Sequence, residues 1–310
     1  MHEGISHVAV LGTGTIGASW AAFFLSRGLS VAASDPAPHT EGFLRHFVEQ
    51  AWPTLERLGL HPGADPTSLR FTADPVAAVD GAGWVQENGP ERIDLKVALF
   101  EQISAALPPD AIIASSSSTL LPTAMQARAR HPERLLLGHP FNPPHLIPLV
   151  EVVGGERTAA EAVDRAMRFY AAIGKHPIRL MKEMPGHVSN RLQAALWREA
   201  AYLVEQGVVS VADVDAAVSQ GPGLRWAIMG PIMTYHLGGG AGGLRYLMDH
   251  IGVAKLWPDL GTPEMTPGFE QALIDGVVAE AAGKPITEMA ADRDRKLVSI
   301  LKGLKYTPST

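Results

Sequence analysis

The sequence contains no cysteine among its 310 residues. Disulfide bonds, thiolate nucleophiles and cysteine-ligated metals are therefore excluded. It also lacks a run of ~18 apolar residues, which a membrane-spanning helix needs. The N-terminal residues lack the basic, apolar and small-residue regions of a signal peptide. We therefore expect a cytoplasmic protein with no membrane partner.

Clusters of basic residues are absent as well. The chain has 26 Lys and Arg against 32 Asp and Glu, which gives a formal net charge of -6. This balance argues against nucleic acid as a partner. The histidines show no metal-ligand spacing, so we expect no metal site. A chain of 310 residues that is 46% hydrophobic is typical of a globular protein with two domains.

The first 35 residues predict a strand, a tight turn, a helix and a second strand. Residues 6–11 are apolar and rich in β-branched side chains, residues 18–28 repeat large apolar side chains at helical spacing, and residues 29–35 are again strand-like. Such a βαβ unit places its two strands parallel in one sheet. Further apolar runs predict strands at 83–88, 111–115 and 135–139. The sequence therefore predicts an α/β fold with a Rossmann-type parallel sheet.

The pattern changes after residue 184. From there on the apolar residues recur at helical spacing between Gly and Pro breaks, and little alternates as a strand would. We expect two domains: a parallel-sheet domain over residues 1–184 and a mostly helical domain over residues 185–310.

A glycine-rich turn follows the first predicted strand. Gly12 permits a tight turn, Gly14 lets a pyrophosphate approach the backbone, and Gly17 lets the helix pack against the strand. Thr15 and Ile16 lie within this turn, and the free amides at the N-terminus of the helix that follows attract phosphate. The turn therefore predicts a dinucleotide site.

Asp35 ends the second predicted strand, about 20 residues after the turn, where such sites carry an acid. Its carboxylate would accept hydrogen bonds from the adenosine ribose and repel a 2′-phosphate. Pro36 and Ala37 follow, and neither could hold such a phosphate. The sequence therefore favours NAD over NADP.

A histidine and a carboxylate lie twelve residues apart in the apolar, proline-rich segment 138–152. They are His139 and Glu151. A carboxylate at one ring nitrogen raises the basicity of the other, which could then exchange a proton with a hydroxyl. Taken alone, such a spacing is more often structural, and the pair gains meaning only from the rest of the chain.

Five motifs resemble one known family in order and spacing. They are GTGTIG with Asp35, ENGPERIDLK, ASSSSTLLP, GHPFNPPHLIPLVEV and PGHVSNRL. With these motifs the chain resembles the 3-hydroxyacyl-CoA dehydrogenase superfamily over essentially its whole length. Within it, the chain is most similar to short 3-hydroxyacid dehydrogenases that do not use CoA esters, first those acting on L-carnitine and then the L-gulonate and lambda-crystallin group. The resemblance implies an NAD-dependent oxidation of a 3-hydroxyl to a 3-keto group.

The resemblance also implies catalytic roles. His139 would be the general base and Glu151 its orienting carboxylate, while Ser118 and Asn190 would hold the reacting oxygen. Ser118 lies 21 residues before the histidine, as in the family, and Ser117 is a possible substitute because residues 115–118 are all serine. Glu91 and Lys96 would lie near the nicotinamide ribose and Asn142 beside the nicotinamide, and Ser118 would also bind the cofactor.

The sequence leaves three classes of substrate open: an acyl-CoA, carnitine and gulonate. Residues 51–70 form a shorter stretch than in the CoA-using enzymes and contain no lysine, although Arg57 and Arg70 keep an acyl-CoA such as 3-hydroxybutyryl-CoA open. Carnitine carries a quaternary ammonium, which aromatic faces can hold, and a carboxylate, which arginine can hold. We expect four residues to serve these roles: Phe141, Arg225, Trp226 and Tyr235. Trp226 and Tyr235 could equally be core residues, and gulonate stays open.

A different class of function is a crystallin-like NAD-binding protein without turnover. The joint presence of Ser118, His139, Glu151 and Asn190 argues against it, since a structural protein would be free to lose them. As in relatives, we expect a homodimer built through the helical half.

Overall fold

The computed structural model describes residues 4–250, 257 and 260–304. The chain divides into two compact units. One contains the residues up to Asn190 together with those from Asp294 onward, and the other spans Arg191–Arg293. The last helix, α13 (Ile286–Gly303), begins in the second unit and ends in the first.

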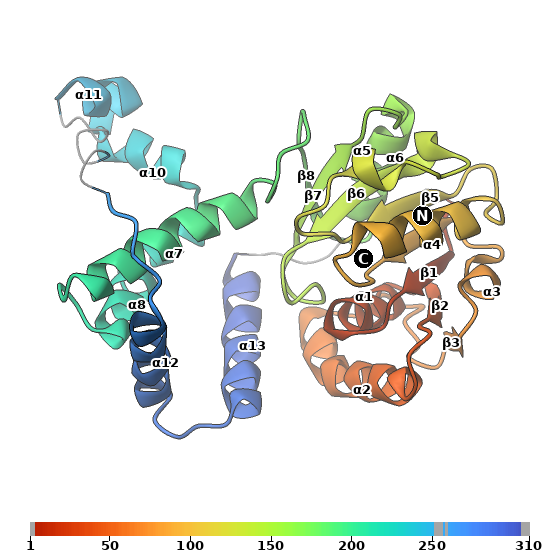
Figure 1. Ribbon diagram of the computed structural model, residues 1–310, viewed down its shortest axis with the longest axis horizontal. Helices are drawn as coiled ribbons and strands as arrows, with labels where there is room; N and C mark the ends of the chain where they lie inside the picture. The colour runs from red at the N-terminus through yellow and green to blue at the C-terminus, as the bar shows by residue number, and fades with distance from the viewer. Residues whose placement is uncertain (1–3, 251–256, 258–259, 305–310) are drawn as a thin grey trace. The chain divides into compact units, whose positions relative to one another are not determined.

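The first unit contains the sheet. Its strands are β1 (His7–Leu11), β2 (Ser30–Ser34), β3 (Leu69–Thr72), β4 (Trp84–Glu87), β5 (Ile112–Ser115), β6 (Leu135–Pro140), β7 (Leu149–Gly154) and β8 (His176–Arg179). Its helices are α1 (Thr15–Ser26), α2 (Thr40–Leu58), α3 (Pro75–Val79), α4 (Ile93–Ser104), α5 (Pro122–Met125) and α6 (Ala160–Ala172), with a 3-10 turn at Pro132–Arg134. The strands stand side by side in the order β3-β2-β1-β4-β5-β6-β7-β8 (Figure 1).

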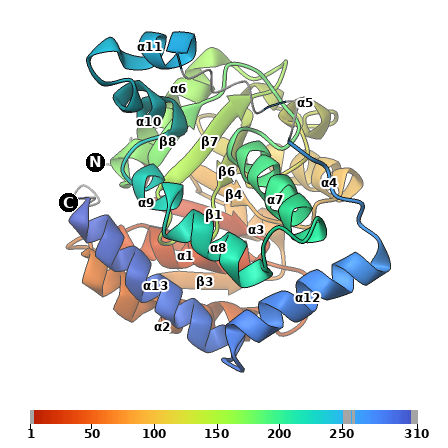
Figure 2. The same ribbon diagram turned by 90° about the vertical axis from the view of Figure 1, so that its left-hand side faces the viewer.

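The predicted α/β fold is confirmed, with one change in strand direction. All neighbouring strands are parallel except β6 and β7, which pair antiparallel. Figure 2 shows β6, β7 and β8 next to one another in the sheet. Only residues 141–148 join these two strands. A parallel connection needs a crossover of about a dozen residues or more, so a link of this length must return the chain antiparallel.

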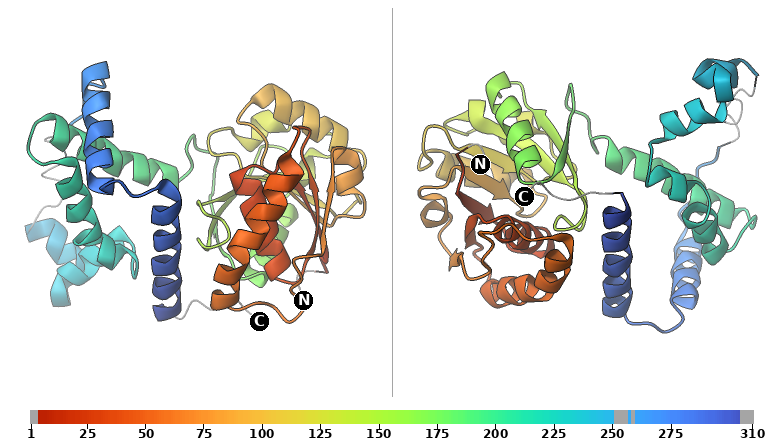
Figure 3. Two further views of the ribbon diagram at one scale, coloured as in Figure 1. Left: turned by 90° about the horizontal axis from the view of Figure 1, so that it is seen from below. Right: turned by 180° about the vertical axis from the view of Figure 1, so that it is seen from behind.

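Two apolar layers explain why the strands are hydrophobic on both faces. On one face α1, α2 and α6 pack against the sheet with Trp20, Phe24, Leu44 and Phe169. On the other face α3, α4 and α5 contribute Val79, Phe100 and Met125. Figure 3 (left) shows α1 and α2 in red and orange, side by side. Because helices cover both faces of the sheet, ligands can reach it only at the ends of its strands, where loops can carry functional residues.

The second unit is helical. Its helices are α7 (Ser189–Glu205, which begins in the first unit), α8 (Val211–Ser219), α9 (Pro222–Trp226), α10 (Pro231–Gly238), α11 (Gly243–His250) and α12 (Pro267–Ala281), with a 3-10 turn at Gly240–Gly242. Within this unit α8 lies beside α12 (Figure 1). Among the described residues, no helix combines the length and apolar character that crossing a bilayer demands.

Candidate active site

The glycine turn has the geometry that its sequence predicts. Gly12 has φ +81°, and a Cβ there would lie 2.7 Å from the carbonyl carbon of Asn88. A Cβ on Gly17 would lie 1.8 Å from the Gly12 oxygen, so the helix could not pack this closely with a larger residue. A Cβ on Gly14 would meet nothing within 4 Å. The backbone at Gly14 is therefore open to an approaching group.

The first turn of α1 is suited to a phosphate. Gly14 is its N-cap residue, and no side chain caps the helix. Thr15 and Ile16 lie in this first turn. Uncapped amides and the positive end of the helix dipole favour an anion. The turn lies between the carboxyl ends of β1 and β4. At this point the chain continues from β1 to β2 on one side of the sheet, while β4 lies on the other side, and nucleotides bind at such a reversal of strand order. The residues present therefore fit the pyrophosphate of NAD.

Asp35 follows β2 directly and is oriented by the glycine turn. Its Oδ2 accepts from the backbone N of Thr13 at 2.8 Å and from the Thr13 hydroxyl at 3.3 Å. Its Oδ1 accepts from the Ala37 amide at 3.0 Å. The carboxylate is thus held beside the turn, and it is only partly buried. This position suits recognition of a ribose hydroxyl.

His139 and Glu151 are cross-strand partners. The antiparallel register of β6 and β7 pairs them directly, and His139 Nδ1 lies 2.8 Å from Glu151 Oε2. His139 is 6% exposed and Glu151 is fully buried. Because the carboxylate only accepts, Nδ1 carries the proton and Nε2 keeps its lone pair. Within the described part of the chain Nε2 has no hydrogen-bond partner, so it is available to take a proton.

The second oxygen of Glu151 is held by the start of α7. Its Oε1 accepts from the amides of Val188 and Ser189, each at 2.9 Å. Burial opposes ionisation of Glu151, but the hydrogen bonds from His139, Ser189 and Val188 outweigh it, so its pKa lies below the ordinary value. The carboxylate is therefore ionised at neutral pH and would stabilise a protonated His139.

The serine run 115–118, which begins at the last residue of β5, uses three of its four hydroxyls internally. Ser115 donates to Glu87 Oε2 at 2.6 Å, Ser116 to Asn88 Oδ1 at 2.7 Å and Ser117 to Glu91 Oε1 at 2.6 Å. The Ser118 hydroxyl, by contrast, bonds to none of the residues that the structure describes. Of the two serines considered from the sequence, Ser118 is thus the one with a hydroxyl to offer.

Asn190 lies next to Ser118. It is the second residue of α7, and its Nδ2 donates to the Ser118 carbonyl at 3.5 Å, a long hydrogen bond. The structure thus brings a residue of the serine loop and one of α7 together, 72 positions apart in the chain.

Glu91 and Lys96 are engaged by the protein itself. Glu91 Oε1 accepts from the Ser117 hydroxyl and, at 2.6 Å, from the Thr119 amide. Burial opposes ionisation of Glu91, but these bonds and the nearby Lys96 outweigh it and lower its pKa. Lys96 is 2% exposed and pairs with Glu87 at 2.6 Å. Lys96 therefore supports the loop from within, and its predicted contact with a ribose is untested.

Phe141 and Asn142 begin the β6–β7 connection, directly after the strand that carries His139. Phe141 is half-buried and Asn142 is exposed. The Asn142–Pro143 peptide bond is cis. Both side chains are thus near the proposed base in the chain, while their contacts with ligands stay predictions.

The three remaining predicted substrate residues lie in the helical unit. Arg225 and Trp226 end α9, and Tyr235 lies within α10. Trp226 is 39% exposed and Tyr235 is 45% exposed, so neither is a core residue of that unit. Their role in binding substrate stays a prediction.

Sequence reasoning missed two buried groups at the site. Glu87 closes β4 and receives hydrogen bonds from Lys96, Ser115 and the Gly89 amide. His187 packs its ring 5.0 Å from that of His139. A carboxylate that ends an apolar strand was a usable signal for Glu87. Nothing in the sequence around His187 distinguishes it from a histidine with a surface or packing role.

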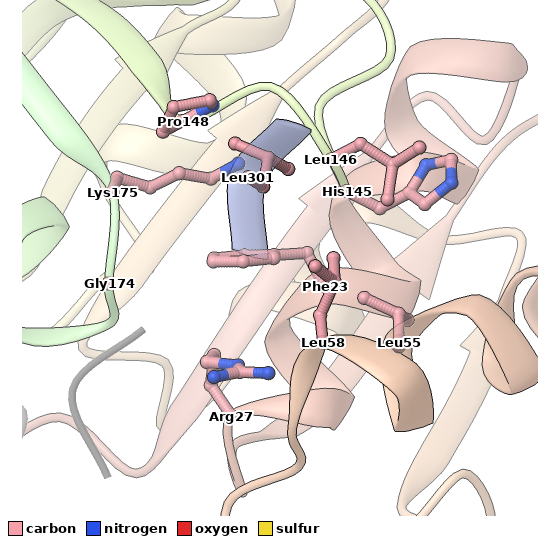
Figure 4. Close-up of a pocket in the computed structure, with 10 residues that line it drawn as sticks. All are labelled: Phe23, Arg27, Leu55, Leu58, His145, Leu146, Pro148, Gly174, Lys175 and Leu301. Carbon is pink, nitrogen blue, oxygen red and sulfur yellow. The ribbon is translucent and has the colours of Figure 1, made fainter. Parts of the chain in front are cut away.

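A small cavity in the first unit is unrelated to this chemistry. It measures about 20 Å³ and has Phe23, His145 and Lys175 among its lining residues (Figure 4). Burial, helped by Arg27, lowers the pKa of Lys175 well below its ordinary value. The Lys175 Nζ donates to the carbonyls of Pro144 and Ile147. The cavity contains no predicted catalytic or cofactor residue and belongs to the packing of the core.

No cluster of metal-ligating side chains occurs in the ranges 4–250 and 260–304 or at residue 257. His145 bonds to the hydroxyl of Ser19 at 2.8 Å and packs edge-on against Phe47. It therefore serves packing in this structure.

Comparison with known proteins gives a consistent result over the whole chain. The family model "3-hydroxyacyl-CoA dehydrogenase, NAD binding domain" matches residues 7–184, and the corresponding C-terminal domain matches residues 186–266. L-carnitine dehydrogenase of Streptomyces coelicolor is 49% identical over 97% of this chain and 95% of that protein. L-carnitine dehydrogenase of Pseudomonas aeruginosa is 47% identical over 98% of this chain and 95% of that protein.

Among solved structures, an NAD+-dependent dismutase, 5-formyl-3-hydroxy-2-methylpyridine 4-carboxylic acid 5-dehydrogenase, superposes with a TM-score of 0.84. It is 33% identical, and the match covers 97% of this chain and 99% of that one. The same architecture thus serves relatives that act on different molecules.

Proposed function

The chain belongs to the 3-hydroxyacyl-CoA dehydrogenase family and is an NAD-dependent oxidoreductase, and from this premise we propose that it oxidises the 3-hydroxyl of L-carnitine to a ketone. The observation that carries the chemistry is the buried pair of His139 and Glu151, 2.8 Å apart. The relatives named L-carnitine dehydrogenase, 43–49% identical over nearly the full chain, support the substrate.

In the proposed mechanism His139 is the general base. Its Nε2 takes the proton of the substrate hydroxyl, while its Nδ1 proton stays bonded to Glu151. Glu151 is ionised and doubly held by the amides of Val188 and Ser189, so it stabilises the positive ring that results. NAD, when bound, accepts the hydride from the carbon that bears the hydroxyl.

We propose that Ser118 and Asn190 hold the reacting oxygen as it becomes a carbonyl. Preorganised donors of this kind act on the charge that develops in the transition state. The free hydroxyl of Ser118 and the position of the Asn190 amide beside Ser118 support this role. Gly12, Gly14, Gly17 and Asp35 would hold the dinucleotide, with Asn142 beside the nicotinamide.

Substrate choice is proposed to rest on aromatic faces. Phe141, two positions after His139, would face the quaternary ammonium. Trp226 and Tyr235 are proposed as further aromatic contacts of the substrate, and Arg225 as the partner of its carboxylate. A cation over an aromatic face is stabilised without a counter-charge. Lysine, the usual partner of CoA phosphates, is absent from residues 51–70, which supports a small substrate over an acyl-CoA.

The test is NADH formation with L-carnitine, L-gulonate, 3-hydroxybutyrate and 3-hydroxybutyryl-CoA. We expect the highest kcat/KM with L-carnitine. Phe141→Leu should raise KM for L-carnitine by about tenfold, since a desolvated cation–π contact contributes up to about 2 kcal/mol. It should leave KM for 3-hydroxybutyrate, which has no cationic group, unchanged. Absence of turnover with all four substrates would reject the proposal and favour a crystallin-like NAD-binding protein.

The assembly is proposed to be a cytoplasmic homodimer formed through the helical unit. That unit carries an apolar groove of about 360 Å³ along α7, α8 and α12, which includes Trp197, Val204 and Ile274. Exposed apolar grooves of this kind support association. Light scattering of the purified protein tests the proposal, and a monomer at micromolar concentration would contradict it.

A further inference from the structure

His187 is a buried histidine beside the proposed proton relay. The residue is 1% exposed, and its Nε2 lies 3.1 Å from the Ser117 carbonyl oxygen. Its Nδ1 is also buried and has no hydrogen-bond partner among the residues that the structure describes. A buried polar atom without a partner costs free energy, so its retention calls for an explanation.

The hydrogen bond determines the tautomer of this ring. A carbonyl oxygen only accepts, so Nε2 carries the proton and Nδ1 holds a lone pair. Burial and the neighbouring His139 lower the pKa of His187. The hydrogen bond to Ser117 and the charges of Glu151 and Glu91 raise this pKa, but they offset the lowering only in part. The ring is therefore neutral near pH 7, and a second proton would put a buried donor at Nδ1 with no acceptor.

The backbone at His187 is also unusual. Its φ is +52°, a left-handed conformation that histidine and asparagine adopt more readily than most side chains. The amides of the next two residues, Val188 and Ser189, point to Glu151 Oε1. The backbone that follows His187 thus holds the Glu151 carboxylate of the relay, while the His187 side chain holds the serine loop.

The bond to Ser117 acts on Ser118. The Ser117 carbonyl and the Ser118 amide belong to one planar peptide group, so the His187 ring determines how that group is oriented. Asn190 donates to the carbonyl on the other side of Ser118. The two peptide groups that flank Ser118 are therefore both held from the segment that begins α7.

We propose that His187 is a positioning residue of the reaction: its neutral ring orients the Ser117–Ser118 peptide so that the Ser118 hydroxyl and His139 Nε2 address the same substrate oxygen. This inference rests on the proposed function, because it assigns His187 a role in that reaction. The role requires a donor at the place of Nε2 and no positive charge, and it does not require an imidazole.

Three substitutions separate this role from simple packing. His187→Gln places an amide nitrogen about where Nε2 lies and stays neutral at every pH. His187→Asn tolerates the left-handed backbone but carries its amide about one bond short of the Ser117 carbonyl. His187→Phe keeps a ring and removes the donor. Initial rates with L-carnitine and NAD, NADH binding by fluorescence and thermal unfolding are measured for each.

The Gln variant should keep kcat within about threefold of the unsubstituted protein, while Asn and Phe should lower kcat about 30-fold, because a displacement of about 1 Å at a reacting group can cost about 100-fold. NADH affinity should be unchanged in all three. On the acid side, log(kcat/KM) should fall more steeply with pH for the unsubstituted protein than for the His187→Gln variant. The reason is that the variant has no ring at this position to become protonated beside His139, Glu151 and Glu91.

The outcomes are distinguishable. If the unsubstituted protein does not turn over L-carnitine, the proposed function fails, and the comparison is repeated with whichever hydroxy acid it oxidises. If His187→Phe keeps full kcat, or if Gln and Asn are equally impaired, the inference is wrong. Should the Phe variant not fold, the difference between Gln and Asn still decides, because the left-handed backbone at this position favours Asn and would therefore give the opposite order.

Discussion

The glycine turn and the β6–β7 strand pair carry the two halves of the proposed active site, and they are built differently. The turn is open: nothing lies within 4 Å of a Cβ on Gly14, and Asp35 is only partly buried. The His139–Glu151 pair is closed, with the carboxylate fully buried and held by three donors. A cofactor that must enter and leave needs exposed amides, whereas a proton relay needs a ring held in one orientation.

The two halves also differ in how far apart in the chain their parts lie. Thr13 and Asp35, which form the nucleotide half, are 22 positions apart within one βαβ unit. The relay joins Glu151 to Ser189, 38 positions away, and Ser118 to Asn190, 72 positions away. Local sequence therefore suffices for the first half, while the second depends on strand register and on the placement of the start of α7.

The largest expected effect separates the two halves directly. His139→Ala should lower kcat/KM with L-carnitine by about 1,000-fold, since a positioned general base contributes about 100- to 10,000-fold. NADH affinity should be unchanged, because the turn is intact. Initial rates and fluorescence titration measure the two effects. His176→Ala, at an exposed position of β8, is the matched control, and full turnover of the His139 variant would reject the base.

A large effect on stability is expected from the buried pair under the β4–α4 loop. Lys96→Met leaves Glu87 buried without its cation, which should lower the free energy of unfolding by about 3–5 kcal/mol. Urea unfolding measures the change. The double variant Lys96→Met with Glu87→Gln should recover part of the loss. A change below about 1 kcal/mol in the single variant would show that the pair is not buried as described.

A smaller effect concerns the open half alone. Asp35→Asn removes the charge that would repel a 2′-phosphate but keeps an oxygen for the Thr13 amide. The ratio of kcat/KM for NAD to that for NADP should fall about tenfold, which corresponds to about 1.4 kcal/mol. Asp80→Asn, at an exposed site, is the control. An unchanged ratio would mean that Asp35 does not contact the adenosine ribose.

The smallest effect is a pH dependence of stability. The pKa of Glu151 is lowered in the folded protein from its ordinary value of 4.5. A depressed carboxyl pKa stabilises the fold above the unfolded pKa, and that stability is lost as pH falls through the folded value. The midpoint temperature of thermal unfolding should therefore fall as the pH is lowered below about 4.5. It should fall less steeply in the Glu151→Gln variant. Equal slopes would show that Glu151 is not held by its three donors.

Sequence reasoning predicted the sheet domain, the glycine turn, Asp35 and five of the strands: β1, β2, β4, β5 and β6. It did not predict β7, because LVEVV lies in a proline-rich stretch whose pairing with β6 is non-local. It also did not predict that the Lys96 ammonium pairs with Glu87 inside the protein. Partners of buried charges depend on which loops meet, and spacing along the chain does not contain that information.

By itself the sequence determined the βαβ unit, the nucleotide turn and the kinds of side chain available for chemistry, because glycine conformations and apolar periodicity act over a few residues. Tertiary structure decided which of them work together. The antiparallel return of β7 sets Glu151 opposite His139, internal hydrogen bonds take up three of four serine hydroxyls and leave Ser118, and the start of α7 brings His187 to the relay. Each of these depends on contacts between segments distant in the chain, which only the packed fold supplies.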